Sequence, residues 1–246
     1  MVMRRENELW SWSAVDLARA IATRAISSRE AVQSSLDRIA KVNPALNAVV
    51  EVLTDEALAE ADAADAAVRS GAELGVLHGV PVTIKVNVDQ RGHATTNGVA
   101  AFRDVIAAED SPVVANFRKA GAVIVGRTNT PAFSHRWFTN NDLHGATYNP
   151  WSRRLTPGGS SGGAAVAVAS GIAPLAVATD GGGSTRIPAA CNGVVGIKQS
   201  NGVIPHSQVQ DAFGNQTYVT PTTRTVADTA LMMQAMAGED PSDPWS

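Results

Sequence analysis

The chain has 246 residues, of which 44% are hydrophobic and 17% are charged. This size and balance are typical of a globular protein with a buried core and exclude a disordered or fibrous chain. The formal net charge is −3 and most lysines and arginines are scattered, which argues against a nucleic-acid or membrane partner. With Cys191 as the single cysteine, neither an internal disulfide nor a thiolate metal cluster can form.

The sequence shows no targeting pattern. Its first ten residues are polar and charged, without the apolar centre of a signal peptide. The longest apolar stretch, 164–169, is too short to cross a bilayer. We therefore expect a cytoplasmic protein.

The N-terminal part has the apolar spacing of helices, which are predicted at 14–25, 29–42 and 54–70. Ser13 and Ser28 stand where N-caps are expected, because their hydroxyls can accept the first free N–H groups of a helix. Asn43-Pro44 is expected to end the second helix, and Gly71 to end the third.

From about residue 79 onward, short apolar runs alternate with helical patterns. Strands are predicted at 80–86, 122–125, 175–179 and 194–197, and helices at 112–120, 162–170 and 225–237. Nearly continuous apolar strands are typical of a buried sheet, so the fold class is α/β with a mixed, largely parallel sheet. A single domain over 1–246 is expected, with a helical entry segment, 1–75, and an α/β core, 76–246.

Two segments without periodicity, 146–163 and 201–222, are predicted as long loops, which are often functional. The first contains the glycine-rich run 158–163 around Ser160, and a second run, 181–183, leads to Ser184. Glycine lets consecutive backbone N–H groups converge on one anionic point. A serine at such a turn therefore lies beside a candidate oxyanion hole.

Other interpretations of these glycines remain open from the residues alone. The first run has the composition of a flexible linker, although Pro157 and a helical pattern flank it. The second could cradle a phosphate, but no Lys-Ser/Thr follows it as in a P-loop. The spacing of Gly158, Ser160 and Gly162 also fits a nucleophile elbow, which should follow a strand and needs a downstream histidine, here His206.

A serine without a well-placed histidine needs another base, and a buried lysine with a lowered pKa can serve. Of the four lysines, only Lys85 and Lys198 adjoin apolar strand-like runs. Either could instead extend its ammonium group to solvent at the end of the sheet. The residues alone leave both lysines as candidates.

Five segments, taken together and in this order, resemble the amidase signature family. They are Gly79–Lys85, Asn149–Trp151, Pro157–Gly163, Asp180–Pro188 and Cys191–Lys198. Each motif alone is a weak signal, but their order along most of the chain is specific. The resemblance implies an amidase signature fold, with helices on both faces of the sheet and with 76–246 as the catalytic core.

The resemblance also implies a Ser-cisSer-Lys triad. Its base is Lys85, its bridging serine is Ser160 on a cis Gly159–Ser160 peptide, and its nucleophile is Ser184. The resemblance further implies an oxyanion hole and residues that support the loops. The oxyanion hole is assigned to Gly181, Gly182 and Gly183, and the supporting residues are Gly159, Ser161, Asp180 and Arg186.

The implied activity is hydrolysis of a small linear or cyclic amide through an acyl-serine intermediate, without a metal or organic cofactor. The chain departs from the common family pattern at Val86 and Gly181, which is expected to alter loop rigidity and substrate choice. Family domains usually continue beyond the length of this chain, so it is expected to be the N-terminal portion of such a domain. The alternatives are a silent fragment that needs a C-terminal partner chain, and an amidotransferase A-type subunit; family members commonly form homodimers.

Overall fold

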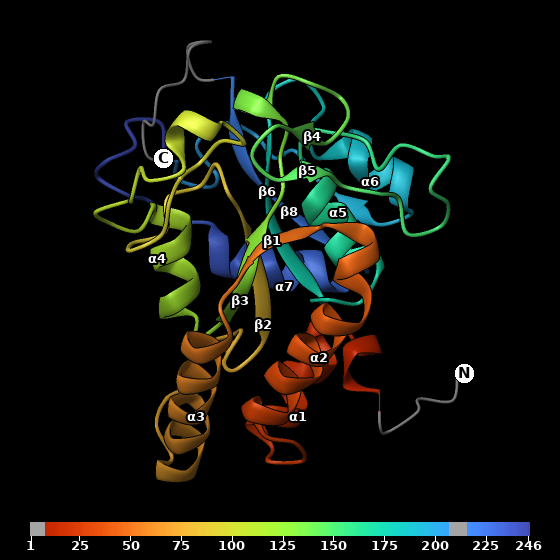
Figure 1. Ribbon diagram of the computed structural model, residues 1–246. Coiled ribbons are helices and arrows are strands. Elements are labelled where there is room, and N and C mark those ends of the chain that lie inside the picture. Colours follow the sequence, from red (N-terminus) through yellow and green to blue (C-terminus); the bar gives the residue numbers. More distant parts are fainter. Residues whose placement is uncertain (1–7, 207–215) are drawn as a thin grey trace.

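The computed structural model describes residues 8–206 and 216–246 of the chain (Figure 1). Its N-terminal part consists of helices and one short strand. They are η1 (Leu9–Ser11), α1 (Ala14–Ala22), α2 (Ser28–Leu46), β1 (Val49–Val52) and α3 (Thr54–Ser70). The three helices predicted in this part are therefore present.

Side chains determine where these helices begin. Ser13 caps α1, as expected, because its hydroxyl accepts the N–H of Asp16 at 3.1 Å. The cap of α2 is Ser27 rather than the predicted Ser28. Ser27 accepts the N–H of Glu30, and the Glu30 carboxylate accepts the Ser27 N–H in return, which forms a capping box.

The end of α2 also differs from the prediction. The helix does not stop at Asn43-Pro44 but continues to Leu46. Pro44 lies in the last turn of this helix, and Asn43 Oδ1 accepts the N–H groups of Ala48 and Val49 beyond it, 2.9 Å from each. Gly71 ends α3 as predicted, in the left-handed conformation that glycine adopts without steric cost.

A six-stranded sheet forms the centre of the molecule, in the order β1-β3-β2-β6-β8-β7 (Figure 1). The remaining strands of this sheet are β2 (Pro81–Lys85), β3 (Val123–Thr128), β6 (Leu175–Asp180), β7 (Val195–Gly196) and β8 (Tyr218–Thr223). The three central strands, β3, β2 and β6, are parallel. The outer pairs are antiparallel, so the predicted mixed sheet is confirmed.

Further elements surround this sheet. They are η2 (Ala100–Phe102), α4 (Pro112–Lys119), η3 (Ala132–Ser134), β4 (Asn140–Asn141), β5 (Gly145–Ala146), α5 (Gly162–Ala169), α6 (Arg186–Asn192) and α7 (Val226–Met236). Among the described residues, the two short strands β4 and β5 pair only with each other.

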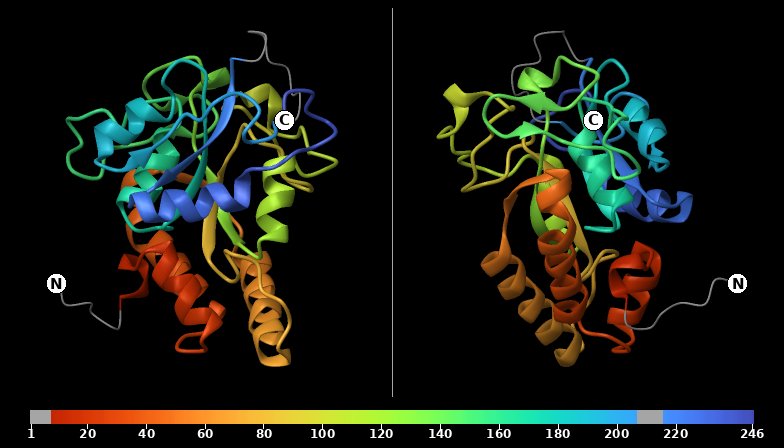
Figure 2. Two further views of the ribbon diagram at one scale, coloured as in Figure 1. Left: turned by 180° about the vertical axis from the view of Figure 1, so that it is seen from behind. Right: turned by 45° about the vertical axis from the view of Figure 1, so that its right-hand side comes forward.

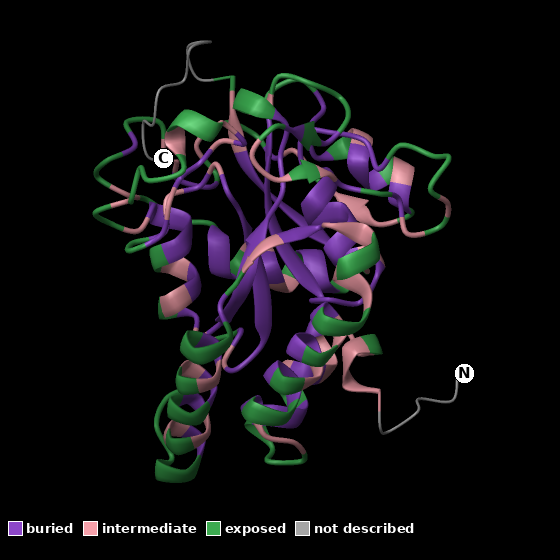
Figure 3. Cartoon of the chain, in the orientation of Figure 1, coloured by how far each residue is buried: buried purple, intermediate pink, exposed green. Residues whose placement is uncertain are grey.

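Helices cover both faces of the sheet. In β3, Ile124 packs in a core with α1, α4 and α7, whereas Val123 and Val125 pack in a second core with α2, α3 and α5. This alternation follows from the period of two residues in a strand. Seen from behind, α7 lies across the sheet (Figure 2). The central strands are buried almost throughout, which explains their unbroken apolar sequence (Figure 3).

Several elements were absent from the sequence prediction, among them β1, α6 and β8. Helix α6 is short and contains Pro188 close to its start. Strand β8 lies within 201–222, which was predicted as a loop; part of that segment, 207–215, lies outside the described residues. Pro221 argues against a strand in the sequence, because proline cannot donate a backbone hydrogen bond. It is accommodated in β8 because, among the described residues, β7 pairs with Thr222 and Thr223 and not with Pro221.

Among the described residues, no helix combines the length and the apolar character that a membrane span requires.

Candidate active site

The parallel strands β2 and β6 bring two of the candidate motifs together. They are neighbours in register, with Ile84 opposite Val177. Their carboxyl ends therefore lie at the same edge of the sheet, where Lys85 ends β2 and Asp180 ends β6. The loop before α5 brings Ser160 and Ser161 to this edge.

Lys85 is the centre of a buried hydroxyl cluster. Its Nζ lies 2.7 Å from Ser160 Oγ, 2.8 Å from Thr179 Oγ1 and 3.0 Å from Ser161 Oγ. All four side chains are buried, and Lys85 has no exposed surface at all. The geometry thus joins the predicted lysine to the predicted bridging serine.

Burial in this cluster lowers the pKa of Lys85 well below its ordinary value, because the ammonium form loses its hydration. The negative charge of Asp180 acts in the opposite direction but is the smaller effect. The three neighbouring hydroxyls are neutral, so none of them balances a positive charge. The site therefore favours a neutral amine, which is the form that can accept a proton.

Ser160 follows a cis peptide bond, Gly159–Ser160, as the sequence resemblance implied. Gly158 before it has φ +73°, and a Cβ at Gly159 would lie only 2.5 Å from the backbone nitrogen of Phe138. Glycine is therefore required at both positions, once for conformation and once for space. These constraints explain the glycine-rich run better than a flexible linker does.

Ser184 is buried but not completely, with 7% of its surface exposed. Its carbonyl accepts the N–H of Ser161 at 3.0 Å, so the backbones of the two serine motifs are joined directly. Within the described residues, no hydrogen bond links the hydroxyls of Ser160 and Ser184. Catalytic hydrogen bonds are often long in unliganded sites and tighten when substrate binds.

Asp180 organises the loop that carries Ser184. Its carboxylate accepts two hydrogen bonds from the Arg186 guanidinium, at 2.9 and 3.0 Å, and others from the backbone N–H groups of Gly183, Thr185 and Arg186. Burial raises the pKa of Asp180, but these hydrogen bonds outweigh it and lower the pKa to about 2. Asp180 is therefore ionised, and its hydrogen bonds hold the loop together.

One assignment in the predicted oxyanion hole does not fit this conformation. The N–H of Gly183 donates to Asp180 Oδ1 at 2.8 Å, so it is not free to bind an oxyanion. The backbone N–H groups of Gly181, Gly182 and Ser184 have no hydrogen-bond partner within the described residues.

The alternative assignments from sequence do not hold. Lys198 lies over the ring of Tyr218, 3.7 Å from its centroid, and donates to the Gln199 carbonyl, so it is not the lysine of this cluster. A nucleophile elbow at Ser160 is also excluded, because no strand precedes it within 147–159 and its hydroxyl contacts a lysine.

Sequence reasoning missed three polar residues of the site: Thr179, Asn87 and Ser134. Asn87 Nδ2 donates to Thr179 Oγ1 at 2.9 Å and to Ser134 Oγ at 3.2 Å. A signal existed for Thr179 alone, since it is a polar residue at the end of an apolar strand that leads to Asp180. Asn87 lies in a turn and Ser134 ends the short helix η3, where spacing carries no information about neighbours.

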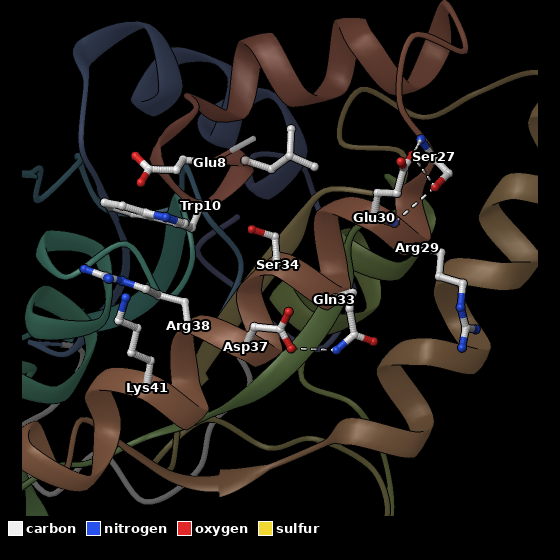
Figure 4. Close-up of a pocket in the computed structure, with 11 residues that line it drawn as sticks. Glu8, Trp10, Ser27, Arg29, Glu30, Gln33, Ser34, Asp37, Arg38 and Lys41 are labelled. Atoms are coloured by element: carbon white, nitrogen blue, oxygen red, sulfur yellow. Dashed lines mark hydrogen bonds between the residues drawn. The ribbon is translucent and has the colours of Figure 1, made fainter. Parts of the chain in front are cut away.

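A surface hollow elsewhere in the molecule has no part in this site. It lies between η1 and the exposed face of α2, and its lining includes Trp10, Asp37, Arg38 and Lys41 (Figure 4). Arg38 stacks on the Trp10 ring at 4.0 Å and donates to the Ser170 carbonyl. None of the lining residues belongs to the Lys85 cluster.

Two features define the class of this protein. It has an α/β fold with a mixed sheet, and a buried lysine–serine cluster lies at the carboxyl ends of the parallel strands. The model of the Amidase family matches residues 30–246, and the chain belongs to that family.

Relatives and solved structures agree with this assignment. The indoleacetamide hydrolase of Bradyrhizobium diazoefficiens is 51% identical over 249 residues, covering 96% of this chain and 46% of that protein. A glutamyl-tRNA(Gln) amidotransferase subunit of Acidothermus cellulolyticus is 43% identical, covering 95% and 46%. The crystal structure of a bacterial aryl acylamidase of the amidase signature family matches with a TM-score of 0.91 at 38% identity, covering 96% and 49%. The chain spans about half the length of the curated relatives it matches.

Proposed function

We propose that this chain carries the catalytic groups of an amide hydrolase that forms an acyl-serine intermediate. One observation carries the proposal: the buried amine of Lys85 lies 2.7 Å from Ser160 Oγ, while the next residue, Ser161, is hydrogen-bonded to the backbone of Ser184. A lysine whose pKa is lowered by burial is a competent general base for a serine.

In the first half of the reaction, Ser184 attacks the amide carbonyl carbon. Its proton passes to Ser160 Oγ while the proton of Ser160 passes to Lys85 Nζ, so the new C–O bond forms as Lys85 becomes an ammonium group. The N–H groups of Gly181, Gly182 and Ser184 are suited to bind the oxyanion of the tetrahedral intermediate.

In the second half, the C–N bond breaks and the proton held on Lys85 returns through Ser160 to the leaving nitrogen. The product is free amine or ammonia, and the acyl group remains as an ester on Ser184. Water then attacks this ester and loses a proton to the same relay, which releases the carboxylate and restores the serine.

The proposed substrate is a small linear or cyclic amide, hydrolysed in the cytoplasm. The 51% identity to an indoleacetamide hydrolase supports a small molecule. A second candidate is a component of an amidotransferase, which the relative of that description at 43% identity favours. Stable co-purification with partner chains would favour this second candidate over a hydrolase that acts alone or as a homodimer.

Labelling with a fluorophosphonate probe for serine hydrolases tests the proposal. Labelling should be lost in Ser184→Ala and weakened in Lys85→Ala, because the first removes the nucleophile and the second its base. Ser34→Ala, a substitution of the same type on α2, should label like the wild type. A folded wild-type protein that takes no label would refute the proposal and favour a silent chain.

A further inference from the structure

The lysine cluster is connected to a second polar group outside it. Asn87, two residues after Lys85, contacts Thr179 Oγ1 at 2.9 Å and Ser134 Oγ at 3.2 Å through its Nδ2. Ser134 Oγ in turn lies 3.1 Å from Thr130 Oγ1. A continuous row of hydrogen bonds therefore runs from Lys85 through Thr179 and Asn87 to the segment around η3.

The directions of these hydrogen bonds make Thr179 important. Ser161 donates its hydrogen to the Thr179 carbonyl, so toward Lys85 its oxygen can only accept. A neutral amine has two hydrogens and one lone pair. One hydrogen goes to Ser161, which leaves one hydrogen and the lone pair to be divided between Ser160 and Thr179. Asn87 donates to Thr179 Oγ1, so the hydrogen of that hydroxyl can point to the lone pair of Lys85, an arrangement that only the neutral amine permits.

Asn87 therefore favours the neutral form of Lys85 in two ways, through the Thr179 hydroxyl and through its own lack of charge. Within the described residues, Thr179 Oγ1 has two hydrogen-bond partners, Lys85 and Asn87. Asn87 is also electrically neutral, and its N–H end faces the threonine oxygen that Lys85 contacts. A neutral group with its positive end toward the cluster disfavours an ammonium ion there, whereas a carboxylate would favour it.

The far end of the row is held in an unusual conformation. Phe133 and Ser134 have φ values of +54° and +59°, in the left-handed region that residues other than glycine rarely adopt. The Phe133 N–H donates to the Asn97 carbonyl and the Ser134 N–H to the Pro131 carbonyl, both at 2.9 Å. Such backbone strain persists where surrounding contacts impose it and is concentrated at functional sites. Here it presents the Ser134 hydroxyl to Asn87.

We propose that Asn87 is a positioning residue for Lys85: braced by Ser134, it holds the Thr179 hydroxyl against the amine and keeps a neutral group beside it. This inference rests on the proposed function, in which Lys85 is the base. Within the described part of the chain, the Asn87 side chain is hydrogen-bonded to Ser134 and Thr179 and not to Ser160 or Ser184.

A charge at this position provides the test. Asn87→Asp preserves the shape of the side chain and places a carboxylate two hydrogen bonds away from Lys85 Nζ. At an effective dielectric constant of about 20 and a separation of about 6 Å, the pKa of Lys85 should rise by about two units. Asn87→Ala removes the N–H groups without adding charge, so it should shift the pKa in the same direction but by less than about one unit.

The measurement is an NMR titration of protein whose lysines are labelled with carbon-13 at Cε. The chain has four lysines, so the signal of Lys85 can be assigned by its absence in Lys85→Met. Gln33→Glu, on the exposed face of α2, adds the same charge elsewhere and should leave the titration of Lys85 unchanged. An unchanged titration of Lys85 in both Asn87 variants would overturn the inference.

The titration separates this inference from the proposed function, because it reads the lysine without any turnover. Absence of fluorophosphonate labelling in the wild type counts against the function, whatever the titration shows. If the wild type is labelled, the rate of labelling can be followed against pH. The acid limb of this profile should lie at higher pH in Asn87→Asp than in the wild type, by the pKa shift that NMR measures. A uniform loss of labelling with an unmoved profile would mean that Asn87 is merely structural.

Discussion

Replacement of Lys85 by methionine should change how the stability of the protein depends on pH. The lysine side chain is completely buried and its amine touches three neutral hydroxyls. Burial lowers its pKa well below the ordinary value, so the folded protein favours the neutral amine. Lys85→Met keeps the length of the side chain and removes the titrating group.

The sign of the effect follows from proton binding. Between the lowered pKa of the folded state and the ordinary pKa of the unfolded state, the unfolded chain binds one proton that the folded protein does not. The free energy of unfolding of the wild type therefore rises with pH, relative to Lys85→Met, by about 1.4 kcal/mol per pH unit. Two pH units inside this window correspond to about 2.7 kcal/mol. Below the lowered pKa, both states are protonated and the difference is constant.

Urea unfolding at a series of pH values between neutrality and pH 10, followed by tryptophan fluorescence, measures this difference. Lys119→Met is the matched control, because Lys119 is exposed on α4 and its replacement should give a difference that does not vary with pH. Wild-type and Lys85→Met stabilities that run parallel across the whole range would refute the reasoning. They would mean that Lys85 remains an ammonium ion in the folded protein.

Two further predictions concern packing and acid stability. Gly163→Ala should destabilise the protein by about 1–3 kcal/mol in urea unfolding, because the added Cβ would meet the backbone of Asn129 at 2.5 and 2.7 Å. Gly182→Ala is the control and should have little effect, because its Cβ would meet nothing within 4 Å. Equal stabilities of the two variants would contradict this prediction. The pKa of Asp180 is lowered from 3.8 to about 2 in the folded protein, so its ionised carboxylate stabilises the fold above pH 4. This contribution to the free energy of unfolding is about 1 kcal/mol after allowance for the exposure of Arg186, and it is lost as the pH falls toward 2. Asp180→Asn should remove that part of the acid dependence, and acid unfolding identical to that of the wild type would argue against the ion pair.

The conformation of short segments was largely encoded in local sequence. Ser13 and Gly71 mark the ends of α1 and α3 because capping and positive φ are properties of single residues. The apolar runs of β2 and β6 predicted buried strands, because a strand covered on both faces can carry few polar side chains. The wrong predictions of secondary structure also came from single residues. Pro221 argued against the strand β8, and Pro44 was expected to stop α2 but lies within its last turn.

The site was predictable only in part. From the residues alone, Lys85 and Lys198 were equivalent candidates, and the resemblance to a family was needed to choose between them. The structure separates them by environment, since Lys85 is enclosed by hydroxyls while Lys198 lies over Tyr218. Burial and the resulting fall in pKa depend on everything packed around the amine, which no local pattern records.

The sequence by itself determined the order of the motifs, the glycines that the two serine loops require and the buried character of the central strands. Only the tertiary structure decided which polar groups meet at the edge of the sheet. Lys85, Thr179 and Ser134 lie far apart along the chain, and the pairing of β2 with β6 and the conformation of the loop at η3 bring them to one row of hydrogen bonds. Hydrogen bonds act over about 3 Å, so a partner can be identified only once the fold has set the distances.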